Sequence, residues 1–166
     1  MILRIKRVLD RALESLVIFA VGVLLAGVTW QVFSRFVLRS PSSWTEEFAT
    51  YLLMWVGLLG AALAVDRGAH LGVDALVLKF PESVRAVLQI IVYVIIAAFA
   101  GFVMVGGGIM LIQRTLVTNQ ILPALRIPMG YVYLCLPISG FFIVFYSVVI
   151  IIGRVAAFLP KRNPEQ

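Results

Sequence analysis

Two adjacent carboxylates, Glu46 and Glu47 in W-T-E-E-F, are the ionisable groups whose position most suggests a specific role. They precede a run with no charge until Asp66, and Ser43 with Glu46 fits the S-x-x-E capping box of a helix start. Negative charge there also meets the positive end of the helix dipole. Capping is one explanation of the pair. The alternative is an ion pair with a basic residue, such as Arg35, of a neighbouring helix or a partner protein.

The other chemistry-bearing residues are too few and too scattered for catalysis. His70 is the only histidine, which excludes a haem held between two histidines of this chain. Cys135, the single cysteine, lies in an apolar run and excludes an intrachain disulfide. The sequence has no Cys/His cluster for a metal, and no nucleophile with a base nearby. We therefore expect no enzyme activity, no cofactor and no metal site.

The composition places the chain in a membrane. Of its 166 residues, 62% are hydrophobic and only 13% are charged, which is more apolar surface than a soluble domain of this size can bury. The net charge is +6, but the basic residues cluster beside the apolar segments. That placement indicates membrane topology and not a nucleic-acid partner.

Four apolar segments are long enough to cross a bilayer as helices, at about residues 15–37, 44–65, 86–113 and 128–153. Two shorter amphipathic segments, at about 2–13 and 70–80, are expected to lie on the membrane surface. The predicted fold is a single all-α integral membrane domain over residues 1–166. Ten Lys and Arg fall on the side of the termini and four on the other, so both termini should be cytoplasmic.

The second span has two unlike faces. On a helix, one face is aromatic and carries Trp44, Glu47, Phe48, Tyr51 and Trp55. The opposite side carries Glu46 and small residues at four-residue spacing, namely Gly57 with Ala61 and Gly60 with Ala64. Small residues let another helix backbone approach closely, as in helix association within lipid. Either face is a candidate for packing against a partner subunit.

Two features predict departures from straight helices. Gly106, Gly107 and Gly108 lie within the third span, where they indicate either a discontinuous helix of the kind found at transporter binding sites, or a bend or close helix contact. Pro137 lies inside the fourth span and removes one backbone hydrogen bond, so we expect a kink there.

The spans carry no charge near their middles, which is unlike a self-sufficient proton-coupled carrier. A scaffold within a complex is therefore the preferred interpretation. Two alternatives are a membrane-anchor subunit of a respiratory-type enzyme complex, and an autonomous small multidrug-type carrier or channel.

Several short motifs, in order along most of the chain, resemble one family: Q-V-F-S-R-F at 31–36, W-T-E-E-F at 44–48, G-A-A-L-A at 60–64, H-L-G-V-D at 70–74 and I-P-M-G-Y-V-Y-L-C-L-P at 127–137. The chain resembles the small, DctQ-like (Q) membrane subunit of tripartite ATP-independent periplasmic (TRAP) transporters. The start of the second span, followed by H-x-x-V-D, is the most specific part of the match.

The resemblance implies a bacterial inner-membrane protein whose partners are a large (M) membrane subunit, a soluble periplasmic substrate-binding (P) protein and lipids. It also implies uptake of an organic acid, such as a C4-dicarboxylate or a sialic acid, driven by an ion gradient that is generally of sodium. In such a system the large subunit moves as an elevator and the small subunit is static scaffold. The external loops, with Arg39, Arg114 and Arg126, are then candidates for contact with the binding protein.

Overall fold

The computed structural model describes residues 2–40, 42–67 and 82–158. These residues form helices and connecting turns, and no β-strand occurs among them. Four helical rods are long and apolar enough to cross a membrane. The predicted surface segment at 70–80, together with His70, lies outside the described residues.

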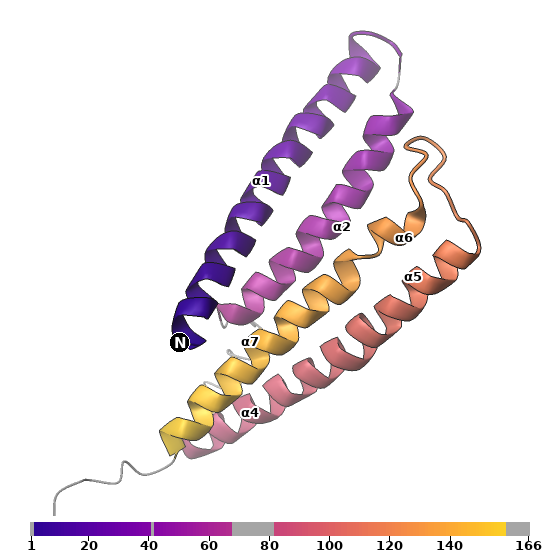
Figure 1. Ribbon diagram of the computed structural model, residues 1–166. Helices are drawn as coiled ribbons and strands as arrows, with labels where there is room; N and C mark the ends of the chain where they lie inside the picture. Colours follow the sequence, from indigo (N-terminus) through magenta and orange to yellow (C-terminus); the bar gives the residue numbers. More distant parts are fainter. Residues whose placement is uncertain (1, 41, 68–81, 159–166) are drawn as a thin grey trace, which may run out of the picture.

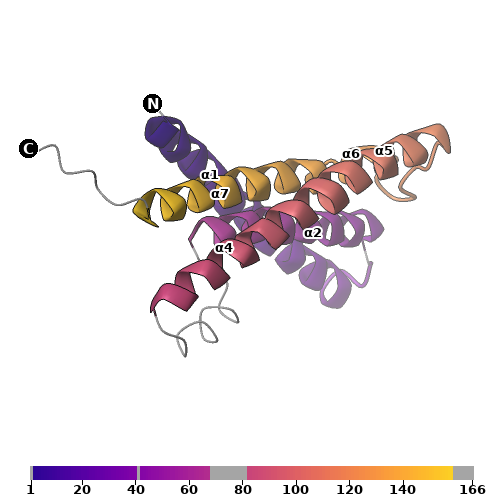
Figure 2. The ribbon, with the colours of Figure 1, turned by 90° about the horizontal axis from the view of Figure 1, so that it is seen from below.

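The four rods lie side by side in the order α1, α2, α7, α4 (Figure 1). α1 (Ile2–Phe36) packs on α2 (Ser43–Asp66), α2 packs on α7 (Cys135–Phe158), and α7 packs on α4 (Glu82–Phe99) and its continuation. Seen from below, α1 and the rod that begins with α4 run in clearly different directions (Figure 2). The start of α1 and the end of α7 lie at one end of the bundle, here called the terminal end; the turns at 37–40 and 118–128 form the loop end.

The first rod is longer than predicted. Residues 2–13, expected as a separate surface segment, continue into the first span as one helix of 35 residues. At 1.5 Å per residue this helix is about 52 Å long, well beyond a hydrocarbon core of about 30 Å. Leu13, at the expected boundary, is only 3% exposed because it packs into the core of the bundle.

The third rod is one continuous run of helix with a π-helical middle. It consists of α4, η1 (Ala100–Gly107, a π-helix) and α5 (Gly108–Val117). The glycines therefore do not interrupt the helix. A Cβ built on Gly108 would lie 3.0 Å from Pro137 Cδ, so the prediction of a close helix contact is confirmed at this residue.

The fourth rod is interrupted where sequence reasoning expected a kink. A short α6 (Met129–Val132) is followed by α7, and the break lies at residues 133–134. Pro137 has no N–H to donate to the carbonyl of Tyr133, and the backbone of Leu136 donates to that carbonyl instead, at 3.1 Å. The missing donor thus accounts for the tightened backbone just before α7.

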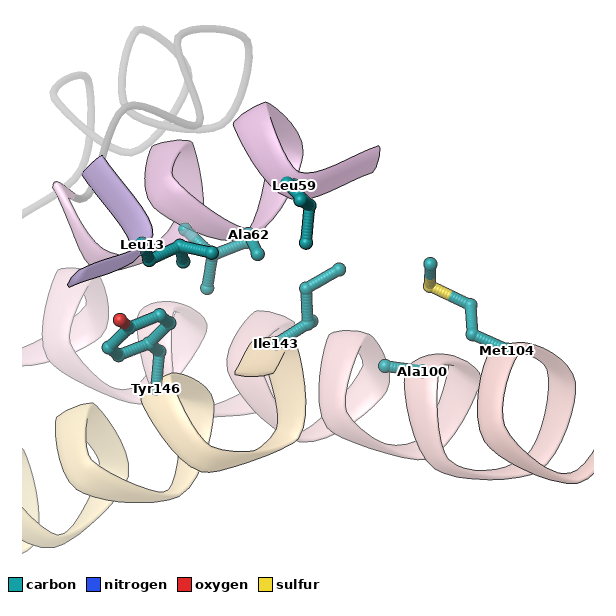
Figure 3. Close-up of a cluster of buried hydrophobic side chains, with 8 residues drawn as sticks. Leu13, Leu59, Ala62, Ala100, Met104, Ile143 and Tyr146 are labelled. Atoms are coloured by element: carbon teal, nitrogen blue, oxygen red, sulfur yellow. The ribbon is translucent and has the colours of Figure 1, made fainter. Parts of the chain in front are cut away.

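The hydrophobic core lies where α1, α2, η1 and α7 meet (Figure 3). Its buried residues are Leu13, Leu59, Ala62, Val65, Ala100, Met104, Ile143 and Tyr146. Ala62, Ala100 and Tyr146 are fully buried, so α2, η1 and α7 each contribute a residue with no exposed surface to this core. A Cβ on Gly140 would lie 2.8 Å from Met104 Cβ, which shows that α7 and η1 touch at backbone distance.

Candidate functional site

Glu47 joins the start of α2 to the 118–128 turn at the loop end. Its Oε2 accepts hydrogen bonds from the backbone nitrogens of Ala124 and Leu125, both at 2.8 Å. These donors belong to the tight turn at 118–128, in which Arg126 N donates to Leu122 O and Leu122 N to Ile127 O. A carboxylate that accepts two amide protons makes stronger hydrogen bonds than a neutral acceptor. Glu47 therefore fixes this turn against the start of α2.

Glu46 lies in the first turn of α2, as expected, but the capping box and an ion pair within the chain are not observed, and an ion pair with a partner protein stays a prediction. Ser42 is the N-cap of α2 in place of Ser43, and no side chain caps the helix, so the Ser43–Glu46 capping box does not form. Among the described residues, no ion pair links Arg35 to either carboxylate. The partner of Glu47 is backbone from a distant turn, which no local sequence pattern indicates.

The aromatic face of α2 is partly used inside the chain. Phe48, Tyr51, Leu52 and Trp55 line a small cavity of about 230 Å³ together with four residues that follow α5, namely Leu122, Leu125, Ile127 and Val132. Trp44, one turn earlier, stays 53% exposed. The predicted aromatic surface therefore faces mostly toward the 118–128 turn and α6.

The small-residue face of α2 is open. No atom lies within 4 Å of a Cβ built on Gly57 or Gly60, and Gly57 and Ala61 are exposed. A groove of about 590 Å³ runs on the α4 side of this face, and Ala61 lines it. A second groove of about 370 Å³ runs on the α1 side, lined by Gly60 and Ala64. The two predicted small-residue pairs thus lie between two grooves.

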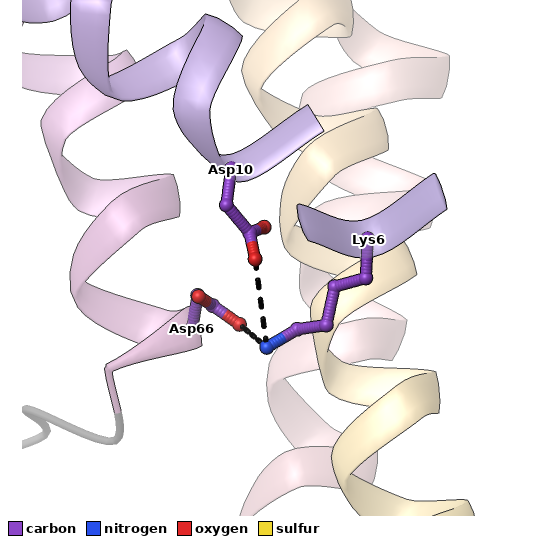
Figure 4. A network of polar contacts seen from close by, with 3 residues as sticks. All are labelled: Lys6, Asp10 and Asp66. Carbon is purple, nitrogen blue, oxygen red and sulfur yellow. Dashed lines mark ion pairs between the residues drawn. The ribbon is translucent and has the colours of Figure 1, made fainter. Parts of the chain in front are cut away.

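A charged cluster at the terminal end was not predicted (Figure 4). Lys6 Nζ lies 2.6 Å from Asp66 Oδ1 and 3.8 Å from Asp10 Oδ2. The same ammonium lies 6.0 Å from the centroid of the Tyr146 ring, within range of a cation–π contact. α1, α2 and α7 are thereby joined at one point. Two features of the sequence could have indicated this cluster. Lys6 and Asp10 are four residues apart on one helix, and Asp66 is the only acid at the end of the second span.

A second ion pair supports the same end of the α1–α2 hairpin. Arg67 Nη2 donates to Glu14 Oε1 at 2.7 Å. Both side chains are substantially exposed, so solvent screens this pair and its contribution is small. The better shielded Lys6–Asp66 pair is the stronger tie between the two helices.

The loop end presents four exposed arginines, Arg35, Arg39, Arg114 and Arg126. Arg39 (φ 51°) and Arg126 (φ 53°) have left-handed backbone and lie in tight turns. The side chains of the four arginines make no ion pair among the described residues. The described residues also contain no group of three or more metal-binding side chains.

Most of the chain matches one known protein family. Residues 24–157 match the family described as tripartite ATP-independent periplasmic transporters, DctQ component. The chain belongs to the DctQ family. The motif-based resemblance is thereby confirmed, and so is the expectation that the chain is not an enzyme. This DctQ-family chain is a multi-pass inner-membrane protein and the small permease subunit of a TRAP transporter.

Its relatives include both separate and longer permeases. The sialic acid TRAP transporter small permease protein SiaQ of Vibrio cholerae is 30% identical over 141 residues, which cover 85% of this chain and 80% of SiaQ. The sialic acid TRAP transporter permease protein SiaT of Haemophilus influenzae is 37% identical over 92 residues, 53% of this chain but only 14% of SiaT. The isethionate TRAP transporter permease protein DctMQ of Oleidesulfovibrio alaskensis is 31% identical over 96 residues, 58% of this chain and 15% of DctMQ.

The two longer relatives identify a partner. In each, the region similar to this DctQ-family chain occupies about a seventh of one polypeptide that is named as a permease. A small subunit that occurs fused to a large permease in relatives works beside one when it is a separate chain. A large membrane subunit is therefore a partner of this chain.

Proposed function

We propose that this small subunit is a static frame for the large permease subunit during uptake of an organic acid. Uptake is driven by an ion gradient, of sodium in our proposal, and the acid is delivered by a periplasmic binding protein. The large subunit binds acid and ion and moves as an elevator, while the small subunit stays fixed in the bilayer. The observation that carries the proposal is the fusion of this region to large permeases in two relatives.

The distribution of charge supports a frame and not a carrier. The sequence has no Asp, Glu, Lys, Arg or His within 15–34, 48–65, 86–113 or 127–153, the middle parts of the four rods. Ion and proton paths through membranes are normally lined by such residues. The charged contacts of the described residues lie at the ends of the bundle, where they tie helices together. A protein built in this way holds a position in the membrane but does not carry an ion across it.

The names of the relatives support an organic acid as the substrate class. SiaQ and SiaT are named for sialic acid and DctMQ for isethionate, and both compounds are organic acids. The groove beside α4 and the cavity between α2 and the 118–128 turn are almost wholly apolar, so neither offers polar groups with which to select among them. Selection of the acid therefore belongs to the other two components.

We further propose that the loop end contacts the binding protein through Arg39, Arg114 and Arg126. Positive charge is disfavoured in short loops that are translocated across the membrane, so topology alone does not account for arginines there. The exposed side chains of these residues make no ion pair among the described residues. An acidic surface on the binding protein would complement them and speed its docking.

The experiment that tests the proposed function is reconstitution of uptake in liposomes. Radiolabelled acid is followed with the large subunit and binding protein present, with and without the small subunit, under an inward sodium gradient. Uptake should require all three components and the gradient. Full uptake by the large subunit and binding protein alone would contradict the proposal, as would uptake that is indifferent to the gradient.

A further inference from the structure

An apolar groove of the described surface runs between α2 and the third rod. Its volume is about 590 Å³, and all eleven side chains that line it are apolar. One wall is α2, with Leu58, Ala61 and Val65; the other is α4 and η1; Leu136 and Ile143 of α7 also line it. The groove is therefore open along one side and closed behind by the helix that holds the two walls together.

The position and chemistry of the groove restrict what can fill it. The lining residues of α2 lie more than ten positions from Ser43, within the charge-free run of that helix. A soluble protein does not reach this depth, and the lining offers almost no polar surface for a polar ligand. Two occupants remain, which are a lipid acyl chain and a transmembrane helix.

The residues at the rim favour a helix. Gly57 and Ala61 are exposed, and no atom lies within 4 Å of a Cβ built on Gly57. A flexible acyl chain can fill a groove whether the side chains around it are large or small. Close contact between two helix backbones, in contrast, requires small residues at four-residue spacing. The α2 wall thus has the surface that a second helix needs.

The wall of the groove that η1 forms is rigid. Ala100 and Met104 of η1 belong to this wall, and η1 contacts α7 at Gly140, where a Cβ would lie 3.2 Å from Ala100 O. One turn further, Gly108 is in equally close contact with Pro137. A wall held by backbone contacts does not collapse into the space beside it, so the groove is preformed. Departures from α-helix of this kind are frequent at functional sites.

We propose that one transmembrane helix of the large permease subunit lies in this groove, with its backbone against Gly57 and Ala61. The partner comes from the relatives in which the same region is fused to a large permease. The inference rests on the proposed function, because it names the surface through which the frame holds the large subunit. It also distinguishes the two faces of α2: the small-residue face meets the partner, and the aromatic face supports the 118–128 turn.

The test is co-purification of the co-expressed large subunit on a tagged small subunit. Ala61→Leu fills the rim of the groove, and Ala98→Leu makes the same change on α4 at an exposed position outside the groove. Both side chains are exposed in the isolated subunit, so neither change crowds its own core. We expect Ala61→Leu to lower the recovered large subunit about tenfold, the usual scale for crowding a packed interface, and Ala98→Leu to leave it unchanged.

A cross-linking measurement makes the outcomes distinguishable. Two variants, Ala61→Cys and Ala98→Cys, each carry a single cysteine in a Cys135→Ala background. Each cysteine is labelled with a photoreactive maleimide in membranes that contain both subunits. Cross-links to the large subunit from position 61 and none from position 98 are expected. If the wild-type chain recovers no large subunit, the proposed function fails. If it does, but the two leucine variants behave alike or position 61 labels only phospholipid, the groove proposal is overturned.

Discussion

The carboxylate of Glu47 lies 2.8 Å from the backbone nitrogen of Ala124, a residue 77 positions later in the chain. The contact joins the start of α2 to the turn between α5 and α6, and the neighbouring amide of Leu125 donates to the same oxygen. The loop end thus has a polar attachment point at Glu47, and the terminal end has one at Lys6 beside the weaker, more exposed Arg67–Glu14 pair. Four rods with few other polar contacts are held in register by these two points.

Replacing Glu47 should release the 118–128 turn. Glu47→Ala leaves two amides without their acceptor, a cost of about 1–3 kcal/mol if water does not replace it. We expect faster hydrogen exchange at Ala124 and Leu125 in detergent micelles, measured by mass spectrometry. Glu46→Ala is the matched control, because Glu46 is exposed and accepts no hydrogen bond from this turn. Equal exchange in the two variants would contradict this role of Glu47.

Closing the contact between α7 and η1 should destabilise the bundle. Gly140→Ala places a Cβ 2.8 Å from Met104 Cβ and 3.2 Å from Ala100 O, and the backbone oxygen cannot move aside cheaply. The expected loss is about 1–3 kcal/mol of stability, seen as a lower Tm by circular dichroism in detergent. Gly153→Ala is the control, since nothing lies within 4 Å of its Cβ and alanine favours helix. A Tm for Gly140→Ala at or above that of the control would refute the close contact.

Removing the ammonium of Lys6 should loosen the terminal end. Lys6→Met leaves Asp10 and Asp66 facing one another, and their side chains are only 26% and 13% exposed. We expect a loss of about 1–3 kcal/mol, less than for a fully buried pair and more than for a surface pair. Arg7→Met, on the next residue and exposed, should be neutral. Adding Asp66→Asn to Lys6→Met should restore part of the loss; additive effects in this double-mutant cycle would mean that the two residues do not interact.

Reversing charge at the loop end should weaken docking of the binding protein. Arg39→Glu, Arg114→Glu and Arg126→Glu are each expected to lower its affinity about twofold to fivefold at low salt, the scale of an exposed charge pair, and the difference should shrink as salt is added. Affinity is measured with the assembled membrane subunits in nanodiscs. Arg7→Glu, at the opposite end of the bundle, is the control. Unchanged affinity and uptake for all three variants would remove the loop arginines from the docking surface.

The architecture could be predicted from sequence because lipid imposes a simple rule on composition. Four charge-free apolar runs gave four rods, and the second span was expected at 44–65 and found at Ser43–Asp66. The first rod was predicted too short because Arg4, Lys6, Arg7 and Arg11 resemble a surface segment, whereas Lys6 is neutralised by Asp66 and the helix continues. Local charge patterns do not reveal such a distant partner.

The fine structure of the candidate site could not be predicted, for two physical reasons. The contacts of Glu47 and Lys6 join residues far apart in sequence, so their partners depend on packing that no local pattern encodes. A π-helix and an α-helix bury the same residue types, so the third span looked uniform in hydropathy. What the sequence did indicate was the small-residue face of the second span and the contact at Gly108, because glycine spacing reports directly on how closely helices approach.

Solute flux through the small subunit by itself is the most direct measure of whether it is a frame. The purified chain is reconstituted into liposomes without its partners, a sodium gradient is imposed, and uptake of radiolabelled sialic acid and C4-dicarboxylate is followed beside liposomes that hold the complete transporter. The account predicts background uptake for the isolated chain and gradient-driven uptake for the complete system. Gradient-driven accumulation by the isolated chain would contradict it.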